Sequence, residues 1–449
     1  MKFNNTFQKY IWSAILLCFF SRPVFAGVDI LFETETKEIS PAQGTSESPN
    51  AGQVRGVLHV VLGKDYLQVE ENGLEYVYDF PGHKVYLKDS QSKKYETYSL
   101  YAYPGFRGAE LENRLLVYDN FRSKGAAFYL TPVILEHFFS IKSNRQTGKI
   151  TDSAGAQKTT FTAEGMTLME VGQTGKPASK KDLGMFLKFL RYRVGGHPEI
   201  LNKLVEKSFI PDWFDVYTYD AQSFKTRYKI SSVKDLPETS YSLEGYTQGP
   251  VKFTGEMIEF AKASVKDVEK NAPQKMAEVE AAIKDFLDNK NYLEAALGCL
   301  EISLYNSRFD APICKSNLKT LQDDGRVKTL LNNLNSSDRD KVEVSYQILK
   351  ELESYTPRKA YVLWVFEANF LGRMGEAARA FDLYYGALKA NPYLAGAYKD
   401  AGELFYSNYK MDMAWFCWDI GRKIYPEHSM LKEVDKFEED IVKRYPEFF

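Results

Sequence analysis

The chain has 449 residues and a formal net charge of -2, from 58 Lys and Arg against 60 Asp and Glu. This balance gives no reason to expect a nucleic-acid partner, because nucleic-acid-binding domains carry a clear excess of basic residues. Aromatic residues make up 14% of the chain. A chain of this length and content can form two or three domains, each with its own core.

Residues 1–26 are typical of a secretory signal peptide. Lys2 and Lys9 form a basic start, an apolar stretch of about ten residues runs from Ile11 to Phe20, and small residues precede Gly27. A bilayer span needs about 20 apolar residues, so a short membrane anchor is the alternative reading. We predict cleavage before Gly27 and a periplasmic or secreted, bacterial-type protein. No later stretch is apolar enough to span a membrane.

Residues 27–250 are predicted to form an antiparallel sheet domain with covering helices. Strand-like segments recur about every eight to twelve residues with turn residues between them, which is the pattern of antiparallel hairpins. Asn72-Gly73 favours a tight hairpin turn. The predicted strands are 28–39, 54–62, 66–70, 74–80, 84–88, 95–100, 159–162, 166–171, 213–219, 225–231 and 241–246. The predicted helices are 110–120, 132–141, 182–193 and 198–207.

Two stretches of this region resemble the curved sheet of periplasmic lipoprotein-carrier proteins. One is the hairpin series from Gly63 to Tyr98. The other begins at Ile210-Pro211, continues through an acidic turn at Asp220, and ends at Gly245-Tyr246. The resemblance implies a half-barrel sheet wrapped around a helix, with a cavity able to take acyl chains or an apolar peptide. The alternative is a half-barrel whose interior is filled by its own side chains.

Residues 251–449 are predicted to be helical throughout, because the hydrophobic period changes from 2 to 3.6 after Thr254. Asn271-Ala272-Pro273 is expected to break the first helix. The last helix has an acidic outer face that suits the cap of a helical stack. The predicted helices are 254–265, 276–288, 291–305, 313–335, 339–355 and 429–445, together with the hairpins of 361–428.

The segment from Tyr361 to His428 repeats itself with a period of 34 residues. Large residues recur at large, small at small and proline at proline. The matched pairs are Trp364 and Tyr398, Ala368 and Gly402, Leu371 and Phe405, Ala380 and Ala414, Tyr384 and Trp418, Ala387 and Gly421, and Pro392 and Pro426. These two units resemble tetratricopeptide repeats, with Glu367 in a slot that is usually apolar and Leu371 in one that is usually aromatic. The alternative is an ordinary pair of amphipathic helical hairpins.

The resemblance implies a concave face that holds an extended protein or peptide. Its inward slots are Asn369 and Arg373 in one unit, and Lys399, Glu403 and Tyr406 in the next. An amide can bond a peptide backbone, and a Lys or Arg can hold a carboxylate. The alternative is a solvated face with no ligand.

Three cysteines follow the predicted signal. In an exported chain Cys299 and Cys314 could form a disulfide, or both could be small core residues of packed helices. Cys417 lies between Trp415 and Trp418 and is expected to be packed.

The sequence contains no recognisable catalytic or metal-binding motif. His59, His83, His137, His197 and His428 are scattered, and no zinc spacing, nucleophile turn or phosphate loop is present. We therefore expect an α+β, two-domain, exported binding or scaffold protein with no cofactor, no metal and no enzymatic activity. The alternative is a carrier that shelters a lipid or a lipid-modified chain in the sheet domain. A pocket that gathers His or Asp with Ser would favour a hydrolase instead.

Overall fold

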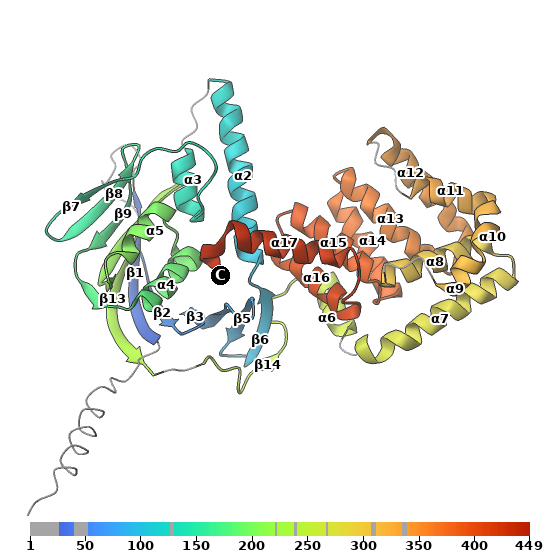
Figure 1. Ribbon diagram of the computed structural model, residues 1–449, viewed down its shortest axis with the longest axis horizontal. Coiled ribbons are helices and arrows are strands. Elements are labelled where there is room, and N and C mark those ends of the chain that lie inside the picture. Colours follow the sequence, from blue (N-terminus) through green and yellow to red (C-terminus); the bar gives the residue numbers. More distant parts are fainter. Residues whose placement is uncertain are drawn as a thin grey trace, which may run out of the picture. The chain divides into compact units, whose positions relative to one another are not determined.

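The computed structural model describes residues 27–39, 53–125, 130–220, 222–237, 240–265, 268–306, 311–334 and 339–449 (Figure 1). The predicted signal peptide, 1–26, lies outside the described residues. The chain divides into two compact units. The sheet unit extends to Val251 and includes Tyr445–Phe449, and the helical unit comprises Lys252–Arg444. A mostly antiparallel sheet followed by an all-helical region is the α+β arrangement that the sequence predicts.

The sheet unit is built on a sheet that has twelve strands within the described residues, in the order β14-β6-β5-β4-β3-β2-β1-β13-β12-β9-β8-β7. Neighbouring strands pair antiparallel, except that β14 is parallel to β6. The strands are β1 Gly27–Ile39, β2 Val54–Leu62, β3 Tyr66–Glu71, β4 Leu74–Asp79, β5 Lys84–Asp89, β6 Lys94–Ser99, β7 Thr151–Ala154, β8 Lys158–Ala163, β9 Met166–Gly172, β12 Trp213–Tyr219, β13 Ser223–Leu236 and β14 Thr247–Gln248. A separate pair joins β10 Gly175–Pro177 to β11 Phe209–Pro211.

The hairpin series β2–β6 follows the predicted strands closely. Asn72 and Gly73 both have positive φ, 53° and 80°, as the predicted tight turn requires. β13 is longer than the predicted 225–231, because it pairs with β1 along the whole length of β1, from Gly27 opposite Leu236 to Ile39 opposite Ser223.

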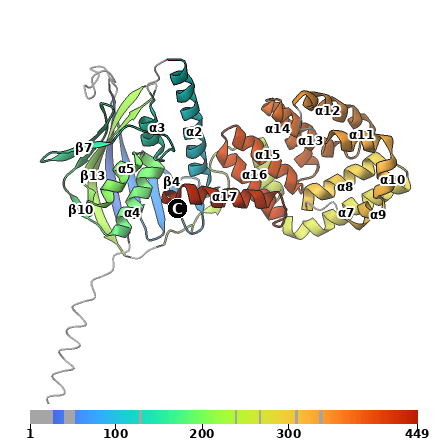
Figure 2. The ribbon, with the colours of Figure 1, turned by 45° about the horizontal axis from the view of Figure 1, so that its top comes forward.

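Helices cover one face of this sheet (Figures 1 and 2). Ser179 and Asp182 form a capping box that starts α4, which then continues directly into a π-helical turn, η2. The helices of this unit are α2 Ala102–Ser123, α3 Pro132–Phe139, α4 Lys180–Phe189, η2 Leu190–Val194 and α5 Pro198–Val205.

Aromatic side chains fill the space between α4 and the sheet. Phe32 of β1 stacks on Phe189 of α4 with ring centroids 5.7 Å apart, and it meets Phe214 of β12 edge-on at 5.9 Å. These three side chains are completely buried. A lipid placed here would have to displace the protein's own core.

The last residues of the chain belong to this core. Phe448, in the short helix η4 Pro446–Phe448, is completely buried against Tyr192, with ring centroids 5.5 Å apart. The Tyr192 hydroxyl donates a hydrogen bond to the Phe448 carbonyl, 3.1 Å away. The sequence predicts a helical domain that runs to residue 449, whereas the structure assigns its last five residues to the sheet unit. The single apolar pair Phe448-Phe449 has no periodicity from which this could be predicted.

The outer face of the hairpin series carries a smaller apolar cluster of Val61, Tyr66 and Val77. Tyr241 covers it, and its hydroxyl donates to Asp79 at 2.8 Å. The predicted strand 241–246 is therefore wrong. This segment turns, with Gly245 at φ 78°, and lies over the sheet instead of pairing with it.

The helical unit consists of helices joined by short connections. They are α6 Glu256–Ser264, α7 Val268–Asp288, α8 Tyr292–Asn306, α9 Pro312–Ser316, α10 Leu318–Asp323, α11 Gly325–Asn333, α12 Arg339–Leu352, η3 Glu353–Tyr355, α13 Ala360–Arg373, α14 Ala377–Ala390, α15 Ala395–Ser407, α16 Met411–Ile424 and α17 Leu431–Arg444.

Two of the predicted helix boundaries are wrong. α7 begins at Val268 and continues through Pro273, which lies inside the helix, so the expected break at Asn271-Ala272-Pro273 is wrong. The predicted helix 313–335 is divided into α9, α10 and α11. The Asp324 carboxylate starts a new helix there by accepting hydrogen bonds from the backbone N–H groups of Arg326 and Val327.

The hairpins α13–α14 and α15–α16 have the packing that the 34-residue period predicts. Ala380 and Ala414 are completely buried. A Cβ at Gly402 would collide with the Trp418 indole, so the small residue permits the close approach of α15 and α16. Pro392 lies between α14 and α15, outside both helices.

The cysteines of the helical unit are in two states. Cys299 of α8 is bonded to Cys314 of α9, with their Cα atoms 5.9 Å apart. Cys417 is a buried free thiol, and burial raises its pKa far above the usual range.

Candidate functional site

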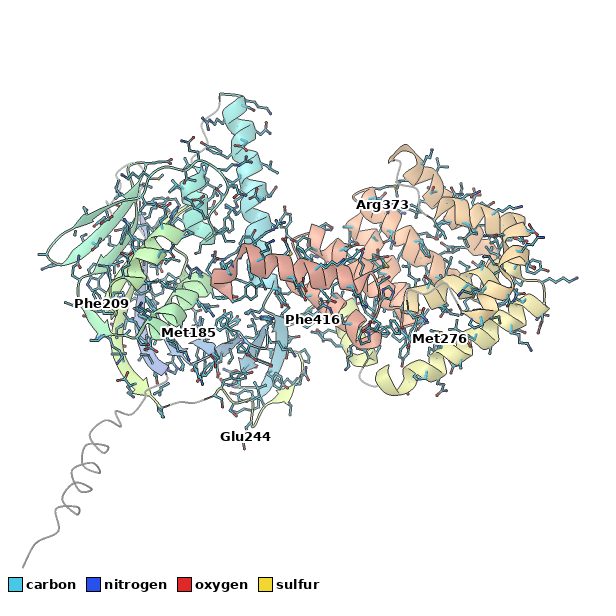
Figure 3. All side chains as sticks on the ribbon, in the orientation of Figure 1. Met185, Phe209, Glu244, Met276, Arg373 and Phe416 are labelled. Carbon is cyan, nitrogen blue, oxygen red and sulfur yellow. A yellow bond between two sulfur atoms is a disulfide. The ribbon has the colours of Figure 1, made fainter. Side chains whose placement is uncertain are left out.

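A groove of about 790 Å³ lies within the helical unit. Four of the five residues placed on the inner face from the sequence line it: Asn369 and Arg373 from α13, and Lys399 and Glu403 from α15. Arg373, the last residue of α13, is exposed (Figure 3). The lining residues are Leu300, Ser303, Leu304, Leu331, Leu334, Phe366, Ala368, Asn369, Phe370, Gly372, Arg373, Tyr384, Lys399, Asp400, Glu403, Leu404, Ser407, Ser429 and Met430.

The groove combines an apolar part with a polar part. Leucines of α8 and α11 and the phenylalanines of α13 supply the apolar surface, while α13 and α15 supply the amide and the charges. Clefts of this size with apolar walls and a few convergent polar groups are typical of ligand sites, whose volumes are about 300–1,000 Å³.

A chain of hydrogen bonds fixes the amide of Asn369. The Tyr384 hydroxyl donates to its Oδ1, and its Nδ2 donates to Asp400 Oδ2 at 2.9 Å. The Asn369 carbonyl oxygen is thus engaged, and one N–H of the amide is left for a ligand. Asn369 can therefore donate this N–H to a peptide carbonyl.

Asp400 is the acidic group in this series of hydrogen bonds. Burial raises its pKa to about 6, although the hydrogen bond from Asn369 and the nearby Lys399 act in the opposite direction. Asp400 therefore changes charge close to neutral pH.

Lys399 lines the groove, but its ammonium group is already paired. Its side chain is buried, and Nζ forms an ion pair with Glu403 Oε1 at 2.7 Å, one helical turn away. Lys399 is 34 residues after Val365, a completely buried position. It thus occupies a core slot of the repeat. It could bind a partner's carboxylate only if its ion pair with Glu403 were broken.

Tyr406 does not line the groove, and its predicted site role is not supported by its position. Its ring packs among Trp415, Trp418 and Phe437, with centroids 5.3 Å from Phe437 and 6.0 Å from Trp418. The ring therefore packs where α15, α16 and α17 meet.

Sequence reasoning missed two kinds of groove residue. Asp400 and Ser407 are 34 residues after Phe366 and Arg373, so extending the period to every lining slot would have found them. Leu300, Ser303 and Leu304 come from α8, whose unit departs from the repeat pattern, and no sequence signal placed them here.

Glu367 shows how a carboxyl group can occupy an apolar slot. Both of its oxygens are buried without a hydrogen-bond partner among the described residues. Burial, reinforced by nearby Glu353, raises its pKa to about 8. The side chain is therefore mostly neutral at pH 7, and it packs in the slot that the repeat reserves for an apolar residue.

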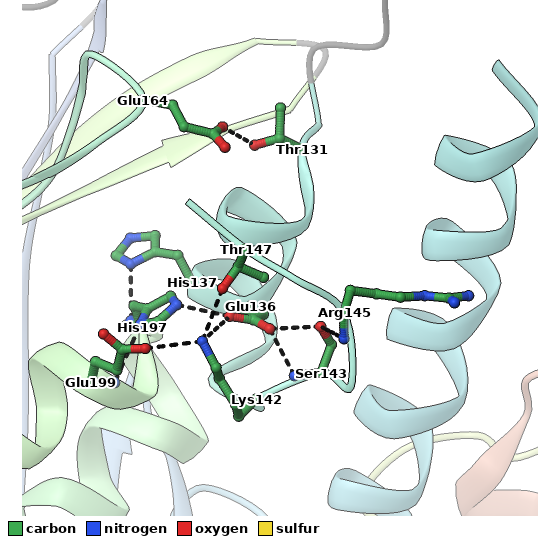
Figure 4. A network of polar contacts seen from close by, with 10 residues as sticks. All are labelled: Thr131, Glu136, His137, Lys142, Ser143, Arg145, Thr147, Glu164, His197 and Glu199. Atoms are coloured by element: carbon green, nitrogen blue, oxygen red, sulfur yellow. Dashed lines mark hydrogen bonds and ion pairs between the residues drawn. The ribbon is translucent and has the colours of Figure 1, made fainter. Parts of the chain in front are cut away.

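A second cluster of polar side chains is buried in the sheet unit (Figure 4). Glu136 accepts from Ser143 Oγ at 2.6 Å, from His197 Nε2 at 2.9 Å and from Lys142 Nζ at 3.1 Å. Burial alone would raise the pKa of Glu136, but the hydrogen bonds from His197, Ser143 and Lys142 bring it below its usual value.

This cluster gathers His, Glu and Ser, but its hydrogen bonds are those of a structural network. His137 donates from Nε2 to the Tyr217 carbonyl and accepts from the His197 backbone at Nδ1. Nδ1 of His197 accepts from the Glu199 backbone. Ser143 donates to the Glu136 carboxylate and not to an imidazole, and the lowered pKa of Glu136 makes that carboxylate a weak base for activating the hydroxyl. Burial lowers the pKa of His137 to about 3, which keeps it neutral.

No protein-family model matches the chain, and no curated protein matches it in sequence. The two resemblances therefore depend on this chain's own residues. Within the described ranges, no helix is both long and apolar enough to cross a membrane, and no group of three His, Cys, Asp or Glu side chains is arranged to hold a metal ion.

Proposed function

We propose that this is a non-enzymatic binding protein whose helical unit holds an extended segment of another protein. The observation that supports this most directly is that Asn369, Arg373, Lys399 and Glu403, chosen from the repeat register alone, line one groove. The spare N–H of Asn369 is a donor for a backbone carbonyl, and Arg373 at the rim is a cation for a carboxylate. The leucines opposite can receive apolar side chains.

The tetratricopeptide resemblance supports the same function. Both paired hairpins have small residues where the helices cross and proline after the second helix. We further propose a periplasmic or secreted location. The Cys299–Cys314 disulfide supports it, because such bonds persist mainly in oxidising compartments.

A photo-crosslinking residue at Ser407 is expected to capture a discrete protein partner in cells that produce the full chain. Ser354 is the matched control, since both serines are exposed and each bonds a carbonyl of the preceding turn, but only Ser407 lines the groove. Arg373→Ala should reduce the adduct about tenfold, the equivalent of about 1.4 kcal/mol. Arg379→Ala, at an exposed arginine of α14 outside the groove, should leave it unchanged. Equal labelling from both serines would contradict the proposal.

The second candidate function is a carrier for a lipid or a lipid-modified protein in the sheet unit. The observation in its favour is the large antiparallel sheet with α4 against its aromatic inner face. The buried rings of Phe32, Phe189 and Phe214 would have to move apart to admit an acyl chain. The carrier function predicts that gently purified protein retains stoichiometric lipid, seen as added mass under native conditions. Protein of unmodified mass after incubation with phospholipid vesicles would count against it.

A further inference from the structure

The groove contains a carboxylate, that of Asp400, near the cations Lys399 and Arg373. Lys399 pairs with Glu403 at 2.7 Å and lies 4.0 Å from Glu433 of α17, so the acids near this cation already match it. Asp400, the next residue, receives a hydrogen bond from the neutral Asn369 amide. Among the described residues it forms no ion pair.

The surroundings of Asp400 make this position costly for an unpaired charge. It lines the groove together with the apolar side chains of Phe366 and Leu300. A partly desolvated carboxylate with a single neutral donor is stabilised when a cation reaches its remaining lone pairs. The hydrogen bonds from Tyr384 to Asn369 and from Asn369 to Asp400 hold Oδ2 of Asp400, and among the described residues Oδ1 of Asp400 accepts no hydrogen bond.

We propose that the groove selects an extended protein segment with a lysine or arginine beside apolar residues, the basic side chain lying against Asp400. This rests on the proposed function and adds the chemistry of the partner. The basic group forms a direct ion pair with Asp400, in addition to the nearby charges of Lys399 and Arg373. Its apolar neighbours cover the leucines of α8 and α11.

The charged and titratable groups facing Asp400 come from several helices. Arg373 of α13 and Lys399 of the same helix as Asp400 are cations, while Glu403 and Glu433 are acids directed at Lys399. His428, which precedes α17, is buried near Lys399, and its pKa is lowered by burial. Since the pKa of Asp400 is about 6, the attraction for a basic side chain should weaken as the pH falls from 7.5 to 5.

The probe is a library of random 12-residue peptides displayed on phage, selected at pH 7.5 on the immobilised full chain. A peptide is taken to bind through the groove when it does not bind the Arg373→Ala variant. The enriched peptides that meet this criterion should carry Lys or Arg next to Leu, Ile or Phe. For one such peptide, replacing its basic residue by norleucine should weaken binding to the wild type about tenfold or more, as expected for a close charge pair. The same replacement should change binding to Asp400→Asn less than about twofold.

The outcomes separate the two proposals. Groove-dependent peptides without a basic preference, or an equal norleucine effect on wild type and Asp400→Asn, would overturn this inference and leave the proposed function standing. Failure to select any groove-dependent peptide would overturn both. The norleucine replacement changes only the peptide, so the loss of binding to the wild type does not depend on the folding of a protein variant. Circular dichroism checks that the Asp400→Asn variant is folded.

Discussion

Replacing Phe448 by alanine is expected to destabilise the sheet unit by about 3–5 kcal/mol, the usual cost of removing a buried aromatic ring. Phe448 is completely buried and contacts Tyr192, while the neighbouring Phe449 ring lies 5.4 Å from Tyr101. The substitution removes the Phe448 ring, which packs against Tyr192 of η2 in the core of the sheet unit. Hydrogen–deuterium exchange is the suitable measurement, because a protein with two units does not unfold in one step. Exchange should accelerate in η2 and in β4, whose Tyr78 ring lies 4.7 Å from Tyr192.

Phe253→Ala is the matched control for this change. Phe253 is 78% exposed, so the same substitution there should alter stability by less than about 0.5 kcal/mol. A Phe448→Ala chain with the exchange pattern of the wild type would show that the tail does not stabilise the sheet unit.

The second large effect is expected at Glu301, the centre of a buried polar cluster that joins α8, α13 and α14. Glu301 is 1% exposed and pairs with the buried Lys359. It also accepts from the Tyr361 hydroxyl at 2.6 Å and from Asn391 Nδ2 at 2.5 Å. Glu301→Ala would leave the Lys359 ammonium buried without its partner. We expect a loss of about 3–5 kcal/mol, typical of breaking one side of a buried pair.

The double substitution Glu301→Leu with Lys359→Met distinguishes a paired charge from simple packing. Replacing both partners by apolar residues of similar size is often neutral or stabilising, so the double variant should recover most of the loss. Exchange rates in α8 and α13 report the result. Equal instability of the single and double variants would show that the cluster stabilises the unit through packing alone.

Local pattern predicted much of the fold. The turn at Asn72-Gly73 and the change of period near Thr254 are properties of neighbouring residues, and the strands β2–β6 begin close to where these signals place them. The errors occur where contacts between residues far apart in the sequence determine the local structure. The segment 241–246 has strand-like composition but lies over Val61 and Val77. Pro273 has the local signature of a break but lies inside α7.

The candidate site was predictable as far as the repeat register extends. The period places Asn369, Arg373 and Glu403 on one face because each position recurs after a complete helical hairpin. It cannot show that Lys399 takes a buried slot or that Tyr406 packs on Phe437, since both depend on which neighbours complete the contact. The α8 contribution of Leu300 and Leu304 arises from helix packing that the sequence pattern does not encode.

The chain leaves the sheet unit after Val251 and returns to it at Tyr445, so the helical unit is an insert with no loose end. A single cut between two of its helices would leave one fragment joined to the sheet by its backbone and the other retained by the buried Phe448. A nicked molecule would then stay together, and the groove could survive damage that would separate the parts of a simple two-domain tandem.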